Sequence, residues 1–203
     1  GMAMQIGKIL FPVTTLGPGK RVGIWVLGCR RNCKGCSNPE LQLFDETKDV
    51  PVGDVIGFVR TLDCEGATIS GGEPFLQAEA LKELVEGLHR EKIEDILVYS
   101  GFTKEQLEQM HDPNIDYVLS HITVLIDGPF VEELVDGVPL RGSSNQRVWL
   151  FDDRYEQQYL ACLRNEKKVD IFEFGDETHF IGIPFKNYRQ LYVKYLRTRG
   201  QSE

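Results

Sequence analysis

Hydrophobic positions follow two different patterns along the chain. Residues 21–27 (RVGIWVL) are almost continuously apolar, which is typical of a strand buried on both faces. In residues 52–62 and 76–88, apolar side chains instead recur at the three- and four-residue spacing of one helix face. The whole pattern predicts strands at residues 5–13, 21–27, 67–70, 96–99, 117–119 and 122–126, and helices at residues 52–62, 76–88 and 103–110.

Strands that alternate with helices at this spacing pair in parallel through crossover connections, so the sequence predicts an α/β fold. Functional sites in such folds lie at the carboxyl ends of the strands. Three unusual segments follow predicted strands: a cysteine-rich loop after Leu27, the motif GGEP after Ser70 and the segment SGFT after Tyr99. We therefore expect these three loops to share one edge of the sheet.

The pattern changes after Asp127. Residues 137–147 are small and polar, as in a loop, whereas residues 154–163 have the pattern of a helix. Residues 169–174 and 178–183 alternate around a Gly-Asp-Glu turn, which predicts a β-hairpin, and residues 187–199 form a last predicted helix. We expect a core of residues 1–148 and a C-terminal extension of residues 149–203 packed on it.

Composition narrows the classes of function. The chain has 203 residues, of which 41% are hydrophobic and 27% charged, which is typical of a globular protein. A net charge of −8 gives it no overall attraction for nucleic acid, and no run approaches the ~20 apolar residues that span a membrane. The first ten residues hold one lysine and no long apolar core, so we expect no secretory signal and a cytoplasmic location.

The five cysteines are the most informative residues. Cys29, Cys33 and Cys36 lie within eight residues, whereas Cys64 and Cys162 are isolated. A structural zinc site needs four ligands, usually as two pairs, and the four histidines form no paired motif. Three thiolates on one short loop suit an iron–sulfur cluster with one iron open to an outside ligand. Zinc and incidental thiols are the alternatives.

The spacing Cys29-x3-Cys33-x2-Cys36 resembles the signature of the radical S-adenosylmethionine (SAM) superfamily. The resemblance implies that these cysteines ligate a [4Fe-4S] cluster whose open iron is chelated by the methionine end of SAM. It also implies that a reduced cluster breaks the S–C5′ bond of SAM and generates a 5′-deoxyadenosyl radical. Gly35 stands where many members have an aromatic residue.

The motif GGEP has two interpretations. Its glycines allow a close approach of backbone to ligand, and Glu73 offers an acceptor for an ammonium group. Alternatively, GGEP is a strand-to-helix turn with Glu73 at a helix N-terminus. The superfamily resemblance implies that Gly71, Gly72 and Glu73 bind the SAM amino group, and that the backbone around Gly35 and Ser37 lies against the adenine.

Two further strand ends are candidates for the same site. Ser100 is suited to bind the ribose of SAM, or belongs to an ordinary helix start with Thr103 as the N-cap. Asp127 lies either at the open end of a barrel or at the cap of a helix that begins at Pro129. Residues 141–147 (RGSSNQR) have the composition of a flexible, solvated loop.

Basic residues flank the cysteine loop. They suit an acidic partner or electron donor, although exposed basic residues are common on any surface. The residues are Arg21, Arg30, Arg31 and Lys34.

The stretches GPGKRVGIWVLGCRRNCKGCSNPE, LIDGPF and RGSSNQR, together with the short length, resemble the activases of anaerobic (class III) ribonucleotide reductase over residues 8–148. The resemblance implies an incomplete (β/α) barrel of the radical SAM type, open on one side. That opening admits the glycyl-radical domain of the reductase, from which the deoxyadenosyl radical removes a glycine Hα. A core of about 150 residues is indeed too small for a full barrel of about 250. The extension, with its hairpin and helix, has no counterpart in the smallest activases.

We therefore expect a radical SAM enzyme that activates a glycyl-radical enzyme, namely the large subunit of anaerobic ribonucleotide reductase, and draws electrons from a reduced flavodoxin- or ferredoxin-type protein. The cluster and SAM carry the chemistry, and no residue of the chain is expected to act as an acid–base catalyst. The first alternative is a radical SAM enzyme that acts on a small molecule in cofactor or modified-base biosynthesis. The second is a non-catalytic iron–sulfur or zinc module, which would bind metal but not SAM.

Overall fold

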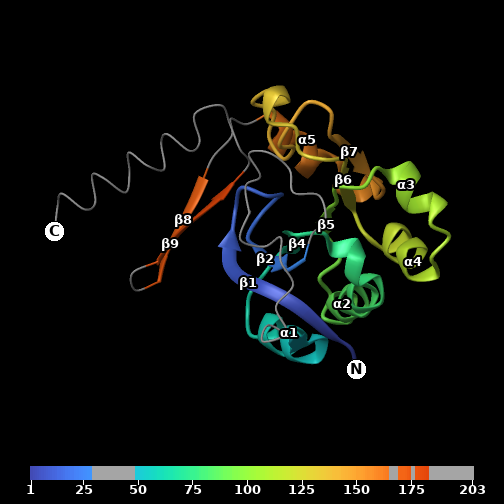
Figure 1. Ribbon diagram of the computed structural model, residues 1–203. Helices are drawn as coiled ribbons and strands as arrows, with labels where there is room; N and C mark the ends of the chain where they lie inside the picture. Colours follow the sequence, from blue (N-terminus) through green and yellow to red (C-terminus); the bar gives the residue numbers. More distant parts are fainter. Residues whose placement is uncertain (29–48, 165–168, 175–176, 183–203) are drawn as a thin grey trace.

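The protein is built around one seven-stranded mixed sheet (Figure 1). The computed structural model describes residues 1–28, 49–164, 169–174 and 177–182. The sheet strands are β1 (Ala3–Val13), β2 (Arg21–Val26), β3 (Asp49–Pro51), β4 (Gly66–Gly71), β5 (Ile96–Tyr99), β6 (Val124–Asp127) and β7 (Arg147–Leu150). The helices are α1 (Val52–Arg60), α2 (Ala78–Arg90), α3 (Lys104–Gln109), α4 (Pro113–His121) and α5 (Glu156–Arg164).

The strand order β3-β1-β2-β4-β5-β6-β7 confirms an α/β fold. The four central strands, β2, β4, β5 and β6, pair in parallel as the crossover pattern predicts. The flanking strands β1, β3 and β7 pair antiparallel, so the sheet is mixed. The carboxyl ends of the four parallel strands consequently lie along one edge.

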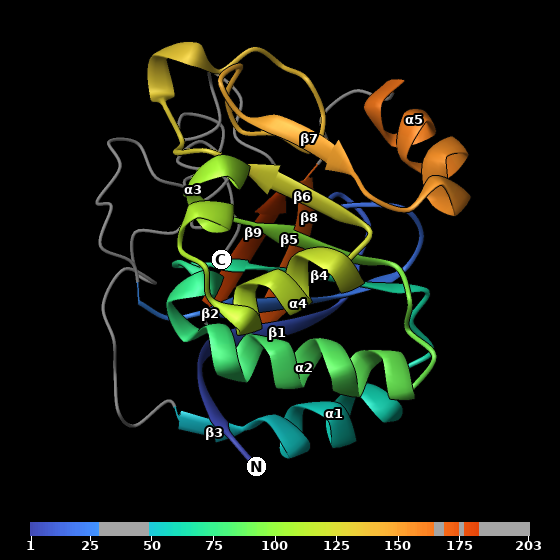
Figure 2. The same ribbon diagram turned by 90° about the vertical axis from the view of Figure 1, so that its right-hand side faces the viewer.

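Helices α1 to α4 cover one face of this sheet, and Figure 2 shows α1, α2 and α4 in front of it. The apolar stripe of α2 is fully buried at Leu81, Leu84 and Leu88, where it meets Ile69 and Val98 of the strands. Each buried leucine contributes roughly 1.5–3 kcal/mol relative to an exposed one. The helix spacing in the sequence therefore identified the main core correctly.

Among the described residues, the chain after β7 packs on the opposite face of the sheet. Tyr159 of α5 lies with Leu97 and Ile126 in one apolar cluster, and Ile181 lies in another with Trp25. Ile181 belongs to the hairpin of β8 (Val169–Phe174) and β9 (Glu177–Gly182), which confirms the predicted hairpin. Figures 1 and 2 both place this hairpin on the side of the sheet away from α1 and α2.

Some sequence predictions were wrong or fall outside the described residues. Residues 117–119 are not a strand but part of α4, because Asp112 caps the helix through the backbone N–H of Asn114 and Pro113 begins it. The short strands β3 and β7 were not predicted. The predicted helix at residues 187–199 lies outside the described residues.

Arg21 does not flank the functional edge, and its predicted role toward an acidic partner is wrong. It begins β2 at the amino end of the parallel strands, with 0% of its surface exposed. Its guanidinium Nη1 donates to Asp95 Oδ2 at 2.7 Å and its Nε donates to Thr68 Oγ1 at 2.9 Å. Tyr159 donates from its hydroxyl to the other oxygen of Asp95 at 2.7 Å. The other flanking bases, Arg30, Arg31 and Lys34, lie outside the described residues.

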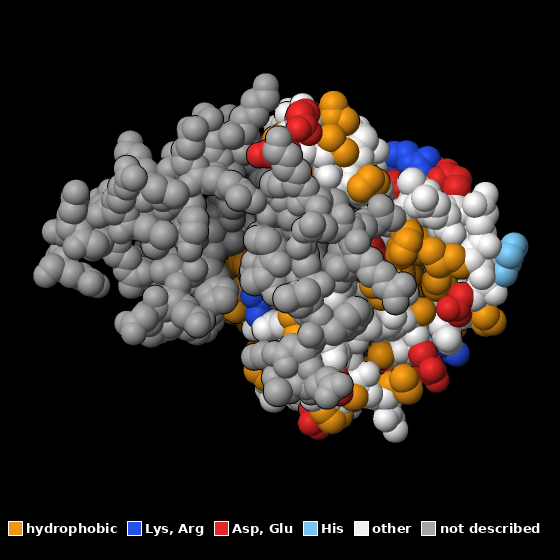
Figure 3. All heavy atoms as spheres, viewed as in Figure 1, with side chains coloured by type: hydrophobic (Ala, Val, Ile, Leu, Met, Phe, Trp, Pro, Cys, Tyr) orange, Lys and Arg blue, Asp and Glu red, His pale blue; other side chains and the backbone are white. Residues whose placement is uncertain are grey.

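The described surface that Figure 3 shows mixes hydrophobic, acidic and basic side chains. Among the described residues, the helices are all too short and too polar to cross a membrane.

Candidate functional site at the carboxyl edge of the parallel strands

The GGEP motif packs against the end of β2 and is hydrogen-bonded to it. Gly71 ends β4 with a φ of +115°, and a Cβ there would lie 2.3 Å from the carbonyl oxygen of Val26. Only glycine fits this turn without strain. Gly72 donates its N–H to that same carbonyl at 2.9 Å, and the N–H of Glu73 donates to the carbonyl of Gly28 at 2.7 Å. The motif is therefore tied to the residue that precedes Cys29.

Glu73 is a buried carboxylate with donors from two loops, and only 1% of its surface is exposed. Its Oε1 accepts from the N–H of Gly101 at 2.7 Å, and both its oxygens lie within 3.1 Å of the hydroxyl of Ser100. Its Oε2 also accepts from the N–H of Phe75 at 3.1 Å, which caps the short 3-10 turn Pro74–Gln77. The turn interpretation is thus confirmed, and the carboxylate also joins β4 to β5.

Ser100 lies at the second predicted strand end, and the structure brings it directly to Glu73. Its hydroxyl accepts from the N–H of Phe102 at 3.0 Å, and its own N–H donates to Ile126 of β6 at 2.9 Å. The helix cap is provided by Thr103, which exchanges side-chain and backbone hydrogen bonds with Gln106. Ser100 therefore hydrogen-bonds the carboxylate of Glu73, whereas Thr103 caps α3.

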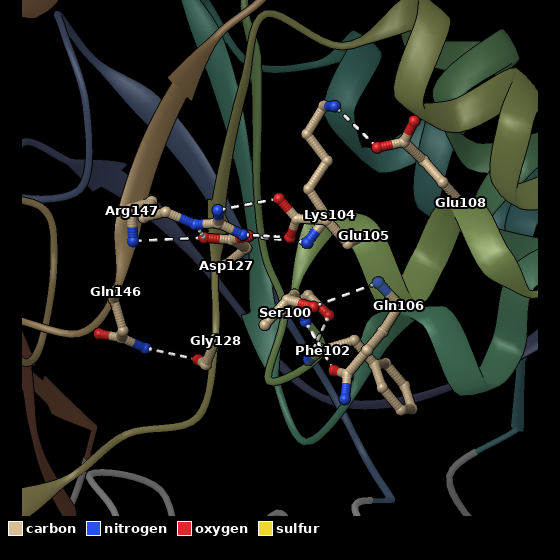
Figure 4. Close-up of polar contacts among 11 residues, drawn as sticks. Ser100, Phe102, Lys104, Glu105, Gln106, Glu108, Asp127, Gly128, Gln146 and Arg147 are labelled. Carbon is tan, nitrogen blue, oxygen red and sulfur yellow. Dashed lines mark hydrogen bonds and ion pairs between the residues drawn. The ribbon is translucent and has the colours of Figure 1, made fainter.

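Asp127, the third strand end, is fully buried and organises the start of α3. Its Oδ2 accepts from the backbone N–H of Lys104 at 2.7 Å and from Arg147 Nη2 at 2.6 Å. The predicted helix at Pro129 is absent from the described residues 128–131, so Asp127 does not cap a helix there. Sequence reasoning missed Arg147, which also pairs with Glu105 on α3 (Figure 4). The guanidinium of Arg147 lowers the pKa of Glu105 to about 2.

Residues 141–147 are less solvated than their composition predicted. Ser143 is fully buried, and the side-chain oxygen of Gln146 accepts from the N–H of Gly142 at 2.7 Å. The side-chain N–H of Gln146 donates to Gly128 at 3.0 Å (Figure 4). The segment is therefore fixed beside the end of β6, and its polar side chains satisfy its own backbone.

The three clustered cysteines, with Gly35 and Ser37, lie outside the described residues. Cys64 and Cys162 are half-buried free thiols, and burial raises the pKa of both. Within the described part of the chain, no group of three His, Cys, Asp or Glu side chains could hold a metal ion. The described residues nonetheless fit a cationic ligand next to the cysteine loop, because the buried carboxylate of Glu73 adjoins Gly28.

Comparison with known proteins shows which family contains this segment of the chain. The 4Fe-4S single cluster domain family matches residues 15–149, which is more than half of the chain and includes the cysteine loop and GGEP. An anaerobic ribonucleoside-triphosphate reductase-activating protein of Haemophilus influenzae is 33% identical over 145 residues, which are 66% of this chain and 90% of that protein. The chain belongs to this family of activating proteins. The resemblance to the activases is thereby confirmed.

Other members of the activating-protein family match a similar share of the chain. The relative from Vibrio cholerae is 31% identical over 154 residues, or 70% of this chain and 95% of that protein. The relative from Enterobacteria phage T4 is 30% identical over 142 residues, or 66% of this chain and 85% of that protein. The family match ends at residue 149, so α5 and the hairpin lie beyond it.

Proposed function

We propose that this protein is a radical SAM activating enzyme for a glycyl-radical enzyme, the anaerobic ribonucleotide reductase. The names of its relatives support the partner, and the 4Fe-4S family match supports a cluster on Cys29, Cys33 and Cys36. When reduced, the cluster supplies one electron that splits SAM into methionine and a 5′-deoxyadenosyl radical, which leaves as 5′-deoxyadenosine after taking a glycine Hα from the partner.

The observation that carries the proposal is the buried carboxylate of Glu73, tied through its backbone to Gly28. A carboxylate attracts an ammonium group more strongly in a buried site than in water, because the local dielectric is lower. Glu73 is therefore suited to hold the amino group of SAM beside a cluster on the adjoining loop. Gly71 allows β4 to turn tightly against the backbone of Val26, which brings Glu73 to the end of β2.

Ser100 acts in this proposal as a positioning residue for Glu73, because its hydroxyl donates to the carboxylate. Its direct contact with the ribose stays a prediction, as do the backbone contacts of Gly35 and Ser37 with the adenine. The chain's own part is to bind and orient SAM, and no acid–base residue is required.

We further propose that the parallel strands and their antiparallel neighbours form the incomplete barrel of the radical SAM type. Residues 1–148 would be the core and residues 149–203 the extension. The partner would present its glycine at the carboxyl edge, and a reduced flavodoxin- or ferredoxin-type protein would supply the electron.

The test uses the full chain, reconstituted with iron and sulfide without oxygen. We expect about four irons per chain, formation of 5′-deoxyadenosine with dithionite and SAM, and a glycyl EPR signal on the anaerobic ribonucleotide reductase of the same genome. Cys29→Ser should abolish all three, whereas Cys64→Ser, at a half-buried free thiol, should preserve them.

Stoichiometric zinc with no iron would refute this function. SAM cleavage that is productive without any protein partner would instead favour the small-molecule alternative, and metal binding without SAM binding would favour a non-catalytic module.

A further inference from the structure

Asp127 ends β6 with a buried carboxylate whose two oxygens are both occupied. Arg147 of β7 is its cross-strand partner in the antiparallel pair of strands. Oδ1 accepts from the backbone N–H and from Nε of Arg147, each at 3.2 Å. Oδ2 accepts from Arg147 Nη2 at 2.6 Å and from the N–H of Lys104 at 2.7 Å (Figure 4). A carboxylate offers about four acceptor positions, so these four donors leave Asp127 none for a ligand.

The end of β6 holds the loop between β5 and α3 at three successive residues. The carbonyl of Ile126 accepts from the N–H of Ser100 at 2.9 Å. The N–H of Gly128 donates to the carbonyl of Phe102 at 3.0 Å. Between these two bonds, the carboxylate of Asp127 accepts the N–H that begins α3. The position of this loop is therefore set from β6.

The same loop provides donors to Glu73 on its other side. The N–H of Gly101 donates to Glu73 Oε1 at 2.7 Å, and the hydroxyl of Ser100 lies within 3.1 Å of both carboxylate oxygens. That hydroxyl also accepts from the N–H of Phe102 at 3.0 Å, which fixes its direction. Any shift of the loop moves both donors, whereas a ligand-binding group must be held within about 0.5 Å of its productive position.

Arg147 connects three elements through one guanidinium group. Besides Asp127 on β6, it pairs with Glu105 on α3, with 2.9 Å between Nη1 and Oε1. The guanidinium carbon lies 4.8 Å from the centre of the Trp149 ring, which supports the group from one side. The planar fork of an arginine bonds two carboxylates in fixed directions, which the single ammonium of a lysine does not do.

We propose that Asp127 and Arg147 are positioning residues for Glu73. The pair fixes the loop between β5 and α3, and the loop fixes the carboxylate of Glu73 in the orientation that binds the amino group of SAM. This inference rests on the proposed function, because SAM is the ligand that Glu73 is proposed to hold. The pair itself does not contact SAM, so it acts on SAM affinity through Glu73.

The first test is amide hydrogen exchange on the full reconstituted chain, resolved to single amides by mass spectrometry. Asp127→Asn places an amide nitrogen against a donor and loosens the loop. We expect the amides of Gly101 and Phe102, which are not bonded to Asp127, to exchange at least about fivefold faster, whereas the β4 amides stay unchanged. Arg147→Gln, at a side chain that is 43% exposed, should act in the same direction and serves if Asp127→Asn does not fold.

The second test is SAM affinity, measured by anaerobic calorimetry at unchanged iron content. Asp127→Asn should weaken SAM binding by about 5- to 20-fold. Arg147→Lys should weaken it less than Arg147→Gln, because an ammonium group still pairs with Asp127. The matched control is Asp95→Asn, the same change in a buried carboxylate paired with an arginine at the amino end. It should lower stability and leave the SAM affinity of the folded protein unchanged.

A double-mutant cycle shows whether Asp127 acts through Glu73. In a Glu73→Gln background, Asp127→Asn should weaken SAM binding by less than about twofold, because both changes disturb the same contact. Equal weakening in both backgrounds would overturn the proposal, and so would unchanged SAM affinity or unchanged exchange at Gly101 and Phe102 in Asp127→Asn. Wild-type protein that holds the cluster but does not bind SAM would refute the proposed function instead, and hydrogen exchange would still decide whether the pair fixes the loop.

Discussion

The two ends of the parallel strands both bury a carboxylate, but they surround it differently. At the amino end, Asp95 accepts from the guanidinium of Arg21 and from the hydroxyl of Tyr159. At the carboxyl end, Glu73 accepts from a serine hydroxyl and from backbone N–H groups. Removing one partner of a buried ion pair leaves an uncompensated charge, which is strongly destabilising. The amino end therefore serves stability, whereas under the proposed function the carboxyl end serves binding.

The largest expected effect is at the amino end. Asp95→Asn leaves the guanidinium of Arg21 buried without its carboxylate, so the free energy of unfolding should fall by about 3–5 kcal/mol. Urea denaturation of the metal-free protein measures this loss. Asp63→Asn, at an exposed position, is the control. A loss below about 1 kcal/mol would mean that this end is not the stabilising one.

The next largest effect is expected at Glu73, where SAM affinity and the free energy of unfolding are measured separately. Glu73→Gln should weaken SAM binding by about 10- to 100-fold, because a hydrogen bond to a charged group is worth about 1.5–3 kcal/mol. The free energy of unfolding should fall by about 1–3 kcal/mol, less than in Asp95→Asn, because the new amide nitrogen faces the N–H of Gly101 or Phe75 and leaves it without an acceptor. Anaerobic calorimetry on the reconstituted protein measures both SAM affinity and its loss.

Glu79→Gln is the matched control for this change, because it removes the same charge from an exposed position in the first turn of α2. If SAM affinity is unchanged in Glu73→Gln, then Glu73 only caps its 3-10 turn and does not bind SAM.

The smallest expected change in the free energy of unfolding is at the exposed Arg147–Glu105 pair, beside the carboxyl end. Arg147 lowers the pKa of Glu105 from 4.5 to about 2, so the stabilising contribution of this pair is complete above pH 4.5 and is lost as the pH falls toward 2. The difference in unfolding free energy between wild type and Glu105→Gln should therefore shrink between pH 7 and pH 3. Urea titrations of the metal-free protein at both pH values provide the measurement.

The comparison variant is Glu108→Gln on the same helix, which loses the exposed pair with Lys104. Its destabilisation should change less between the two pH values, and an equal change would contradict the special role of Arg147.

The sequence predicted the site better than it predicted the opposite end. Glu73 and Ser100 were expected at one edge because parallel strands align their carboxyl ends, and they are hydrogen-bonded. Arg21 was misplaced because it precedes Cys29 closely in sequence, whereas its partner Asp95 is 74 residues away. Such a long-range pair has no local signature.

Two local errors have different causes. The apolar run Tyr117–Val118–Leu119 resembles a strand, but the helix start at Asp112 and Pro113 outweighs it. Residues 141–147 resemble a solvated loop because their polar side chains pair with their own backbone, as Gln146 does with Gly142. Composition does not reveal where a polar group finds its partner.

The hydrogen bond from Glu73 N–H to the Gly28 carbonyl has a thermodynamic consequence. It mechanically connects the loop proposed to hold SAM with the residue before the first cluster ligand. Under the proposed function, two ligands that each order one side of this bond must help each other by the same factor. SAM should therefore tighten the binding of the cluster in an equilibrium competition with a chelator, and an intact cluster should tighten SAM binding by the same factor.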